Sequence, residues 1–130
     1  MVITLLGNDA VLSGLCAIVY WCFDKRRGRL VTYLLFFGGY VNFFLKVLIP
    51  WPRPPAELRI VEQNDLSNGF PSGHAQDSAT VWTWLSLDFK KQILPALGVL
   101  LVVAVGISRI YLGVHYPAQV IGGWMIGLAI

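Results

Sequence analysis

Two histidines and a short turn-forming stretch are the residues of this chain best suited to chemistry. The stretch is Pro71-Ser72-Gly73-His74, and an apolar segment follows it directly. A turn that leads into a helix points free backbone N–H groups and the positive end of the helix dipole outward, which makes an anion site. His74 beside that site can carry a proton near neutral pH. The alternative is a loop that only caps the start of a helix.

Two further pieces of sequence carry the other candidate residues. Lys46 and Arg53 precede the turn, while Ser108, Arg109 and His115 follow it. Cations and N–H donors neutralise the charge on phosphoryl oxygens, and arginine can do so with two hydrogen bonds. One histidine can attack phosphorus while the other protonates the leaving oxygen. Without an Asp/Glu cluster or thiolate ligands, no metal and no other cofactor are expected.

Long apolar runs must position these residues. The chain has 130 residues, enough for a single domain over 1–130, and it is 56% hydrophobic but only 13% charged. Soluble domains typically contain about 25% charged residues. The composition therefore predicts an integral membrane protein rather than a disordered or secreted one, with the bilayer and not nucleic acid as its partner.

Five apolar runs predict an all-α fold, a polytopic transmembrane bundle of about five helices. The runs are residues 1–23, 30–49, 75–89, 92–107 and 117–130. A charged turn over 24–29 separates the first two, and a proline-rich stretch over 50–55 ends the second. The last run covers only about 21 Å at helical rise, less than the hydrocarbon thickness, so the sequence is expected to be clipped at its C-terminus.

Alternation of these helices sorts the basic residues by side. Six of the ten Lys and Arg lie in the turns after the first and third runs: Lys25, Arg26, Arg27, Arg29, Lys90 and Lys91. By the positive-inside rule that side is cytoplasmic, so the segments 50–74 and 108–116 are extracytoplasmic. Three basic residues are predicted near the extracytoplasmic side, against this rule: Lys46, Arg53 and Arg109. Each either binds an anion or snorkels toward the lipid headgroups.

The three pieces, in this order, resemble the phosphatidic acid phosphatase type 2 superfamily. The resemblance runs from Lys46 to about Gly123. It implies a metal-independent helical bundle that cleaves phosphate esters through a phosphohistidine. His115 would be the nucleophile and His74 the general acid. The residues that would bind the phosphate are Lys46, Arg53, Ser72, Gly73 and Arg109.

One position departs from the family pattern, which has an acidic residue four positions after the nucleophile. Gln119 stands there. A glutamine oxygen can accept a hydrogen bond from imidazole and fix its tautomer, but it cannot stabilise imidazolium as a carboxylate would. Asp77 lies three residues after His74 on the same helix face and could orient that histidine. Its alternative role is that of a hydrogen-bonded polar residue inside the bundle.

Two functions follow from these patterns. The first is hydrolysis of a lipid phosphate or prenyl pyrophosphate at the extracytoplasmic face of the plasma (inner) membrane. The second is a non-catalytic lipid-phosphate binding or transport-related protein that retains the phosphate site, and Gln119 motivates it. Haloperoxidase chemistry would use the same oxyanion pocket, but the short membrane-embedded chain argues against it. Nothing in the sequence specifies an oligomeric state.

Overall fold

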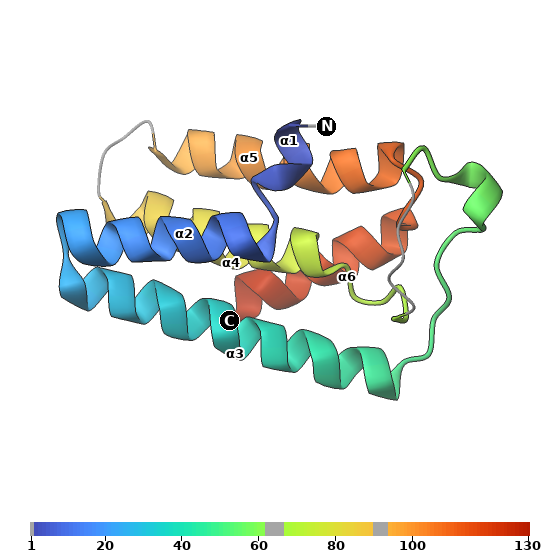
Figure 1. Cartoon of the computed structure of the whole chain (residues 1–130), viewed down its shortest axis with the longest axis horizontal. Coiled ribbons are helices and arrows are strands. Elements are labelled where there is room, and N and C mark those ends of the chain that lie inside the picture. The colour runs from blue at the N-terminus through green and yellow to red at the C-terminus, as the bar shows by residue number, and fades with distance from the viewer. Residues whose placement is uncertain (1, 62–66, 90–93) are drawn as a thin grey trace.

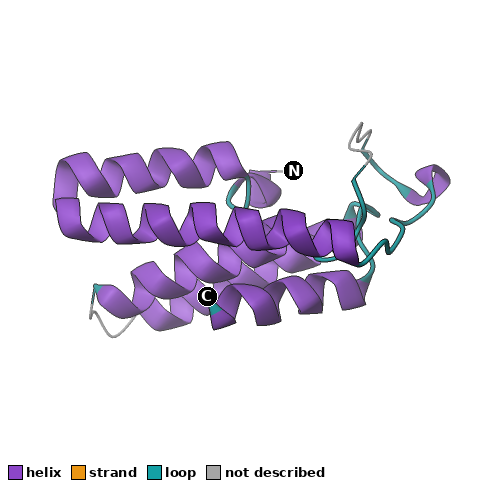
Figure 2. Ribbon diagram, turned by 90° about the horizontal axis from the view of Figure 1, so that it is seen from below, coloured by secondary structure: helices purple, strands orange, loops and turns teal. Residues whose placement is uncertain are grey.

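The computed structural model describes residues 2–61, 67–89 and 94–130, and within these ranges it contains helices and loops but no strand, which confirms the all-α prediction. The long helices lie side by side along the longest axis (Figures 1 and 2). The elements are α1 (Val2–Leu5), α2 (Asp9–Ile18), the π-helix η1 (Val19–Phe23), α3 (Lys25–Leu48), the 3-10 helix η2 (Ala56–Leu58), α4 (Gly73–Asp88), α5 (Leu94–Tyr111) and α6 (Pro117–Ala129).

The first apolar run is broken, so the expectation of one helix over residues 1–23 is wrong. A turn separates α1 from α2, and the Asn8 side-chain oxygen caps α2 by accepting a hydrogen bond from the Ala10 N–H at 3.0 Å. A Cβ at Gly7 would lie 2.9 Å from the His74 carbonyl oxygen. Glycine therefore lets this turn lie directly against the start of α4.

The charged segment after the first run is the beginning of α3 and not a turn. Asp24 caps this helix, since its carboxylate accepts hydrogen bonds from the N–H groups of Arg26 at 2.7 Å and Arg27 at 3.1 Å. These two bonds hold the pKa of the Asp24 carboxyl below its usual value. At the other end, α3 stops before Pro50, as proline requires.

Among the residues that the structure describes, two helices, α3 and α5, are long and apolar enough to cross a membrane by length and composition, and Asp9–Phe23 is a shorter apolar stretch. A helix lies in each of the five apolar runs, but the count of five membrane spans stays a prediction. The fourth run extends further than expected, because α5 continues to Tyr111. Ser108 and Arg109 therefore stand on the last turn of a helix, not in a loop.

Helix α4 lies at the centre and contacts α2, α3, α5 and α6. The polar first half of α4 faces other helices, with Gln76 and Thr80 both buried. The Thr80 hydroxyl donates to the Gly127 carbonyl of α6 at 2.9 Å. A Cβ at Gly123 would lie 2.6 Å from the Ser72 carbonyl oxygen, so this glycine permits the close contact between α6 and the start of α4.

The main apolar core lies where α2 and η1 pack on α3 and α4, away from the long loop. Its members are Leu12, Cys16, Val19, Val31, Leu35, Val81 and Leu85. An ion pair between Arg27 and Asp88 joins α3 to α4 at this end, with 2.8 Å between Nε and the carboxylate oxygen. In Figure 1, α2 and α3 are close here and diverge toward the opposite end. That divergence leaves room for a cavity at the end where the polar segments meet.

Candidate active site

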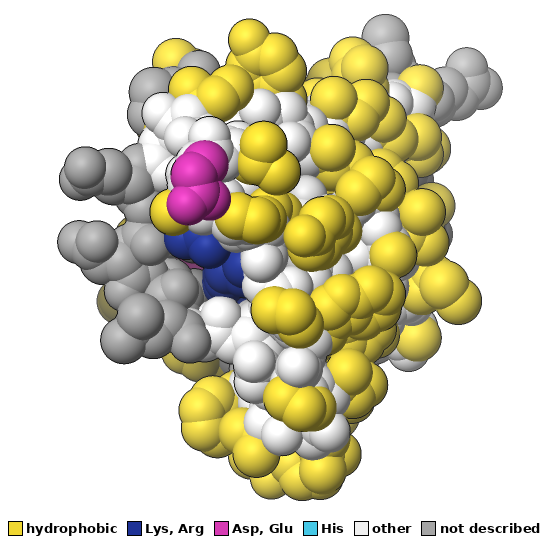
Figure 3. All heavy atoms as spheres, turned by 90° about the vertical axis from the view of Figure 1, so that its right-hand side faces the viewer, with side chains coloured by type: hydrophobic (Ala, Val, Ile, Leu, Met, Phe, Trp, Pro, Cys, Tyr) yellow, Lys and Arg dark blue, Asp and Glu magenta, His cyan; other side chains and the backbone are white. Residues whose placement is uncertain are grey.

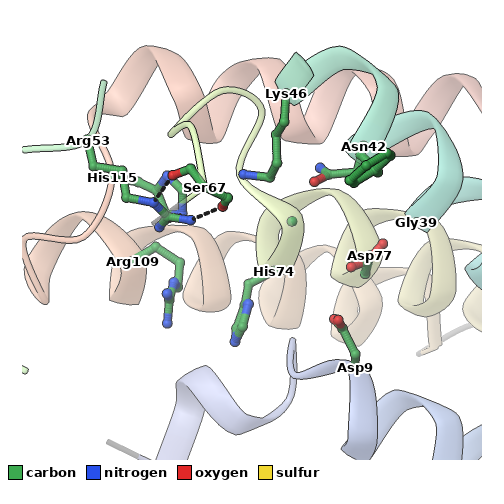
Figure 4. Close-up of a pocket in the computed structure, with 12 residues that line it drawn as sticks. Asp9, Gly39, Asn42, Lys46, Arg53, Ser67, His74, Asp77, Arg109 and His115 are labelled. Carbon is green, nitrogen blue, oxygen red and sulfur yellow. Dashed lines mark hydrogen bonds between the residues drawn. The ribbon is translucent and has the colours of Figure 1, made fainter. Parts of the chain in front are cut away.

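The predicted site residues come from separate parts of the chain and meet at one end of the bundle. The end of α3, the following loop, the start of α4 and the α5–α6 connection surround a cavity of about 310 Å³. The lining residues are Asp9, Gly39, Asn42, Phe43, Lys46, Arg53, Ser67, Gly73, His74, Asp77, Arg109 and His115 (Figure 4). Seen from that end, Lys and Arg side chains gather in a surface that is otherwise mainly hydrophobic (Figure 3).

The His115 ring is held by one partner on each nitrogen. Its Nδ1 lies 3.1 Å from Gln119 Oε1, and its Nε2 lies 3.1 Å from Arg53 Nη1. An amide oxygen only accepts and a guanidinium only donates, so Nδ1 carries the proton and Nε2 presents a lone pair. Both partners therefore select the tautomer in which Nε2 is the nucleophilic atom.

The orientation of the Gln119 amide is set by two backbone groups. Its Oε1 also accepts from the Tyr116 N–H at 3.1 Å, and its Nε2 donates to the Pro52 carbonyl at 2.8 Å. The backbone carbonyl of Gln119 accepts a hydrogen bond from the Ser72 backbone N–H at 3.0 Å. This fully buried residue thus connects the proline-rich loop, the start of α4 and the His115 segment.

Burial keeps His115 neutral. The ring is only 4% exposed. Burial, followed by the nearby Arg53 guanidinium, lowers the pKa of His115 to about 3. A neutral imidazole with its lone pair on Nε2 is the form that can attack an electrophile once Arg53 moves to the substrate.

Loop carbonyls hold two of the cations at the cavity. Arg53 donates from Nε to the Ser67 carbonyl at 3.0 Å and from Nη2 to the Ser67 hydroxyl at 3.1 Å. Lys46 Nζ donates to the Asn68 carbonyl at 2.6 Å, and Asn68 Nδ2 donates back to the Lys46 carbonyl at 2.7 Å. Neither side chain is simply extended toward headgroups, which argues against the snorkelling alternative.

The third cation, Arg109, is buried at the end of α5, with 6% of its surface exposed. Its Nη1 donates to the Thr4 hydroxyl of α1 at 2.9 Å. Snorkelling does not describe a guanidinium that lies inside the protein and lines the cavity. The broken first run therefore has a role here, since α1 supplies a partner that holds this arginine.

The start of α4 gives a mixed result for the predicted turn. Gly73 and His74 line the cavity, but Ser72 does not. Ser72 makes no side-chain cap hydrogen bond, so the capping alternative does not describe it. Its buried Oγ has no hydrogen-bond partner within the described part of the chain. The role of Ser72 as a phosphate ligand stays a prediction.

Comparison with known proteins decides the family. A family model of the PAP2 superfamily matches residues 27–130. The chain belongs to the PAP2 superfamily. The resemblance inferred from the three motif pieces is thereby confirmed.

Individual PAP2 relatives agree with this assignment. The chain is 31% identical to phosphatidylglycerophosphatase B of Bacillus subtilis over 97% of its own length and 67% of that protein. It is 28% identical to lipid phosphate phosphatase delta of Arabidopsis thaliana, over 94% of its length but only 36% of that protein. It is 39% identical to lipid A 4'-phosphatase of Bacteroides thetaiotaomicron over 66% and 42% of the two chains. The chain thus spans between about a third and two thirds of these curated relatives.

Two solved PAP2 structures share the fold. The first is the crystal structure of a transmembrane PAP2 type phosphatidylglycerolphosphate phosphatase from Bacillus subtilis, with a TM-score of 0.86, 30% identity, and coverage of 97% of this chain and 68% of that one. The second is Aquifex aeolicus LpxE, with a TM-score of 0.83, 29% identity, and coverage of 98% and 77%. The PAP2 chain is therefore a membrane protein.

The role of Asp77 in orienting His74 stays a prediction. Both side chains line the cavity, and the carboxyl group of Asp77 lies opposite that of Asp9 of α2. Figure 4 shows these two carboxyl groups facing each other, beyond His74 as seen from His115. Among the described residues, no hydrogen bond joins Asp77 to His74. Asp77 is thus a polar residue of the cavity wall.

Sequence reasoning missed several lining residues of this PAP2 site. Asn42, Ser67 and Asp9 lie far apart in the chain, and no local motif marks them. Of these three, Asp9 is the residue that the sequence could have marked as functional, because a charged residue inside an apolar run is costly unless it has a role.

Gln76 shows how the bundle positions the site, and its replacement gives a testable result. Its Nε2 donates to the Gly38 carbonyl at 2.6 Å, and its Oε1 accepts from Asn42 at 2.9 Å, so it links α4 to α3. Gln76→Leu would leave both groups buried without this partner, and the expected cost is about 2–3 kcal/mol of stability. The measurement is thermal unfolding in detergent. A Tm equal to that of the parent would contradict the linking role.

The His115 pKa predicts a pH effect on stability. The folded protein holds the ring neutral down to about pH 3, whereas an unfolded histidine takes up a proton below its ordinary pKa of 6.5. The unfolded state therefore binds more protons in this window, and stability falls as the pH falls. At pH 5 the expected cost is about 2 kcal/mol relative to pH 7. His115→Gln removes this titration, so its Tm should decline less steeply between pH 7 and 5. Parallel declines would contradict the prediction.

Proposed function

We propose that this PAP2 chain forms a metal-independent phosphatase that hydrolyses a lipid phosphate or lipid pyrophosphate through a phosphohistidine at His115. The observation that carries the proposal is the His115 ring, whose Nε2 lone pair faces a cavity lined by three cations. Relatives named phosphatidylglycerophosphatase B, lipid A 4'-phosphatase and undecaprenyl-diphosphatase support the substrate class.

In the first step, His115 Nε2 attacks phosphorus and the bond between phosphorus and the ester oxygen breaks. Arg53 exchanges its contact with the ring for a phosphoryl oxygen. Together with Lys46 and Arg109 it neutralises the charge that spreads over the phosphoryl group. His74, in its protonated form, donates its proton to the leaving oxygen, so the product is a neutral alcohol. For a pyrophosphate, the leaving group is the remaining lipid monophosphate.

In the second step, water attacks the phosphohistidine from the side that the alcohol has left. His74, now neutral, takes a proton from this water. The bond between phosphorus and Nε2 breaks, inorganic phosphate leaves, and the lone pair returns to His115. Gln119 keeps the proton on Nδ1 throughout, so the ring is ready for the next substrate.

The surroundings of the cavity suit a substrate with an apolar tail. Gly39 and Phe43 of α3 line the cavity, and Phe43 is 68% exposed. A tail that leaves past this helix face stays in hydrocarbon while the phosphate reaches the cations. The basic residues Lys25, Arg26, Arg27 and Arg29 begin α3 at the far end of the bundle, and Lys90 and Lys91 lie outside the described residues. By the positive-inside rule, the site is then extracytoplasmic.

The test combines turnover with trapping of the intermediate. Purified protein in detergent, with a chelator present, receives phosphatidylglycerophosphate, phosphatidate and undecaprenyl pyrophosphate, and released phosphate is measured. An alkaline quench preserves phosphohistidine for mass spectrometry. Chelator-resistant release with a phosphorylated peptide containing His115 is the expected result. Release that stops with the chelator, or phosphate on another residue, would overturn the proposal.

The second candidate is a lipid-phosphate binding or transport-related protein without turnover. It is favoured by one observation, the neutral Gln119 amide at His115 Nδ1, where a carboxylate would better stabilise a positively charged ring. It predicts vanadate binding without phosphate release from any of the three lipids. Release that depends on His115 would dismiss it.

A further inference from the structure

One buried carboxyl group of the cavity has no part in the steps above. Asp77 is 5% exposed and lines the cavity, yet its Oδ1 has no hydrogen-bond partner within the described part of the chain. Asp9, at the start of α2, lies opposite it (Figure 4). The two carboxyl groups thus stand together in a cavity that three cations also line.

The order of residues along the cavity says which part of a substrate would meet this pair. In Figure 4, Arg53 and His115 lie at one end, His74 is in the middle, and Asp77 and Asp9 lie beyond it. In phosphoryl transfer, the attacking and leaving atoms are roughly in line on opposite sides of phosphorus. A substrate attacked by His115 therefore places its leaving oxygen near His74 and the next atoms of the leaving group toward the two acids.

Space and chemistry agree on what fits there. The cavity has a volume of about 310 Å³, about ten times the roughly 30 Å³ that one water molecule occupies in the liquid. It therefore has room for a phosphoryl group and for the next atoms of the leaving group. Asp77 Oδ1 is a carboxyl oxygen that can accept a hydrogen bond, and a buried acceptor without a partner is costly. A leaving group that donates a hydrogen bond would satisfy Asp77. A second phosphate in this place would set acceptor oxygens against acceptor oxygens.

We propose that Asp77, together with Asp9, forms a specificity subsite that accepts a hydrogen-bond-donating group, a hydroxyl or an ammonium, next to the scissile ester, and that disfavours a diphosphate. This inference rests on the proposed function, because it assumes attack by His115. It deepens that function by selecting phosphomonoesters with a polar leaving alcohol over prenyl pyrophosphates.

Four probes in the same detergent separate the possibilities. Dodecyl phosphate is the reference, because its leaving alcohol has no further polar group. Lysophosphatidate adds a hydroxyl, sphingosine 1-phosphate adds an ammonium and a hydroxyl, and farnesyl pyrophosphate has a phosphate in that position. We expect kcat/KM of the parent to be about tenfold higher for at least one donor-bearing probe than for dodecyl phosphate, and lower for farnesyl pyrophosphate. The better of the two donor-bearing probes tells hydroxyl from ammonium.

Variants assign this preference to Asp77. Asp77→Asn removes the charge while keeping the shape, and Asp77→Leu also removes the acceptor. Asp77→Leu should erase the tenfold preference for the donor-bearing probe, and Asp77→Asn should raise the relative kcat/KM for farnesyl pyrophosphate several-fold. Asp88→Asn is the matched control, since Asp88 lies on the same helix at the opposite end and pairs with Arg27. It should keep the ratios of the parent.

The outcomes separate this inference from the proposed function. If the parent hydrolyses dodecyl phosphate in a His115-dependent way but treats all four probes alike, or prefers farnesyl pyrophosphate, the subsite is wrong while the phosphatase stands. If no probe is hydrolysed, the proposed function fails first. Should Asp77 variants not fold, as judged by vanadate binding, the substrate ratios of the parent and of Asp9→Asn still decide. Parental ratios in the Asp9→Asn protein, or a parent without preference, would overturn the inference.

Discussion

Replacement of His115 by alanine is expected to lower kcat for every lipid phosphate by about four to six decades, because the proposed mechanism needs its Nε2 to attack phosphorus. Vanadate binding should persist, since Lys46, Arg53 and Arg109 remain. The measurement is phosphate release under single-turnover conditions, beside vanadate titration by tryptophan fluorescence. A variant that binds vanadate and still releases phosphate within tenfold of the parent would contradict attack by His115.

His74→Ala is the matched control, because it removes the second histidine of the same cavity. If His74 only protonates the leaving oxygen, its loss matters less when the leaving group needs no proton. We expect His74→Ala to retain far more activity toward p-nitrophenyl phosphate than toward dodecyl phosphate, and His115→Ala to lose both. Equal losses for the two substrates in His74→Ala would contradict its role as the acid. This comparison separates the two roles, which a single variant cannot do.

The parts of the site that were predicted from sequence are those in short local motifs. Gly73 and His74 stand in a turn that opens a helix, and such a turn is recognisable from residue types alone. Lys46, Arg53 and Arg109 were identified because they break the charge pattern of a membrane protein. Local chemistry and topology therefore suffice to name these positions, although not the contacts that hold them.

What sequence could not supply are contacts between distant segments. Ser67 holds Arg53, Thr4 holds Arg109, and Asn42 joins Gln76 across two helices. Each partner is an ordinary polar residue in its own segment, and only packing brings it to the site. The break in the first apolar run was missed for a related reason. Its apolar composition suggested a continuous helix, whereas the cap at Asn8 begins a new one.

Gln119 is the residue whose replacement best distinguishes the proposed phosphatase from the alternative, a lipid-phosphate binding protein without turnover. Gln119→Leu removes the acceptor at His115 Nδ1, so only the Arg53 contact at Nε2 still favours the tautomer and orientation of the ring. We expect kcat to fall by about two to three decades, since weakened tautomer control is the effect seen when a triad carboxylate becomes an amide. Vanadate affinity should change little. A kcat within threefold of the parent would show that Gln119 does not position His115.

Gln119→Glu is the isosteric companion and is expected to act in the opposite direction. Formation of the phosphohistidine leaves a positive charge on the ring, and a carboxylate at Nδ1 stabilises that charge where an amide cannot. The substitution also turns the donor at the Pro52 carbonyl into an acceptor, which costs the 2.8 Å hydrogen bond from Gln119 Nε2. The charge effect is larger, so we expect about a tenfold rise in kcat with a lower Tm. A carboxylate that lowers both kcat and Tm would mean that the anchoring of Gln119 to Pro52 matters more to this site than the charge at the ring.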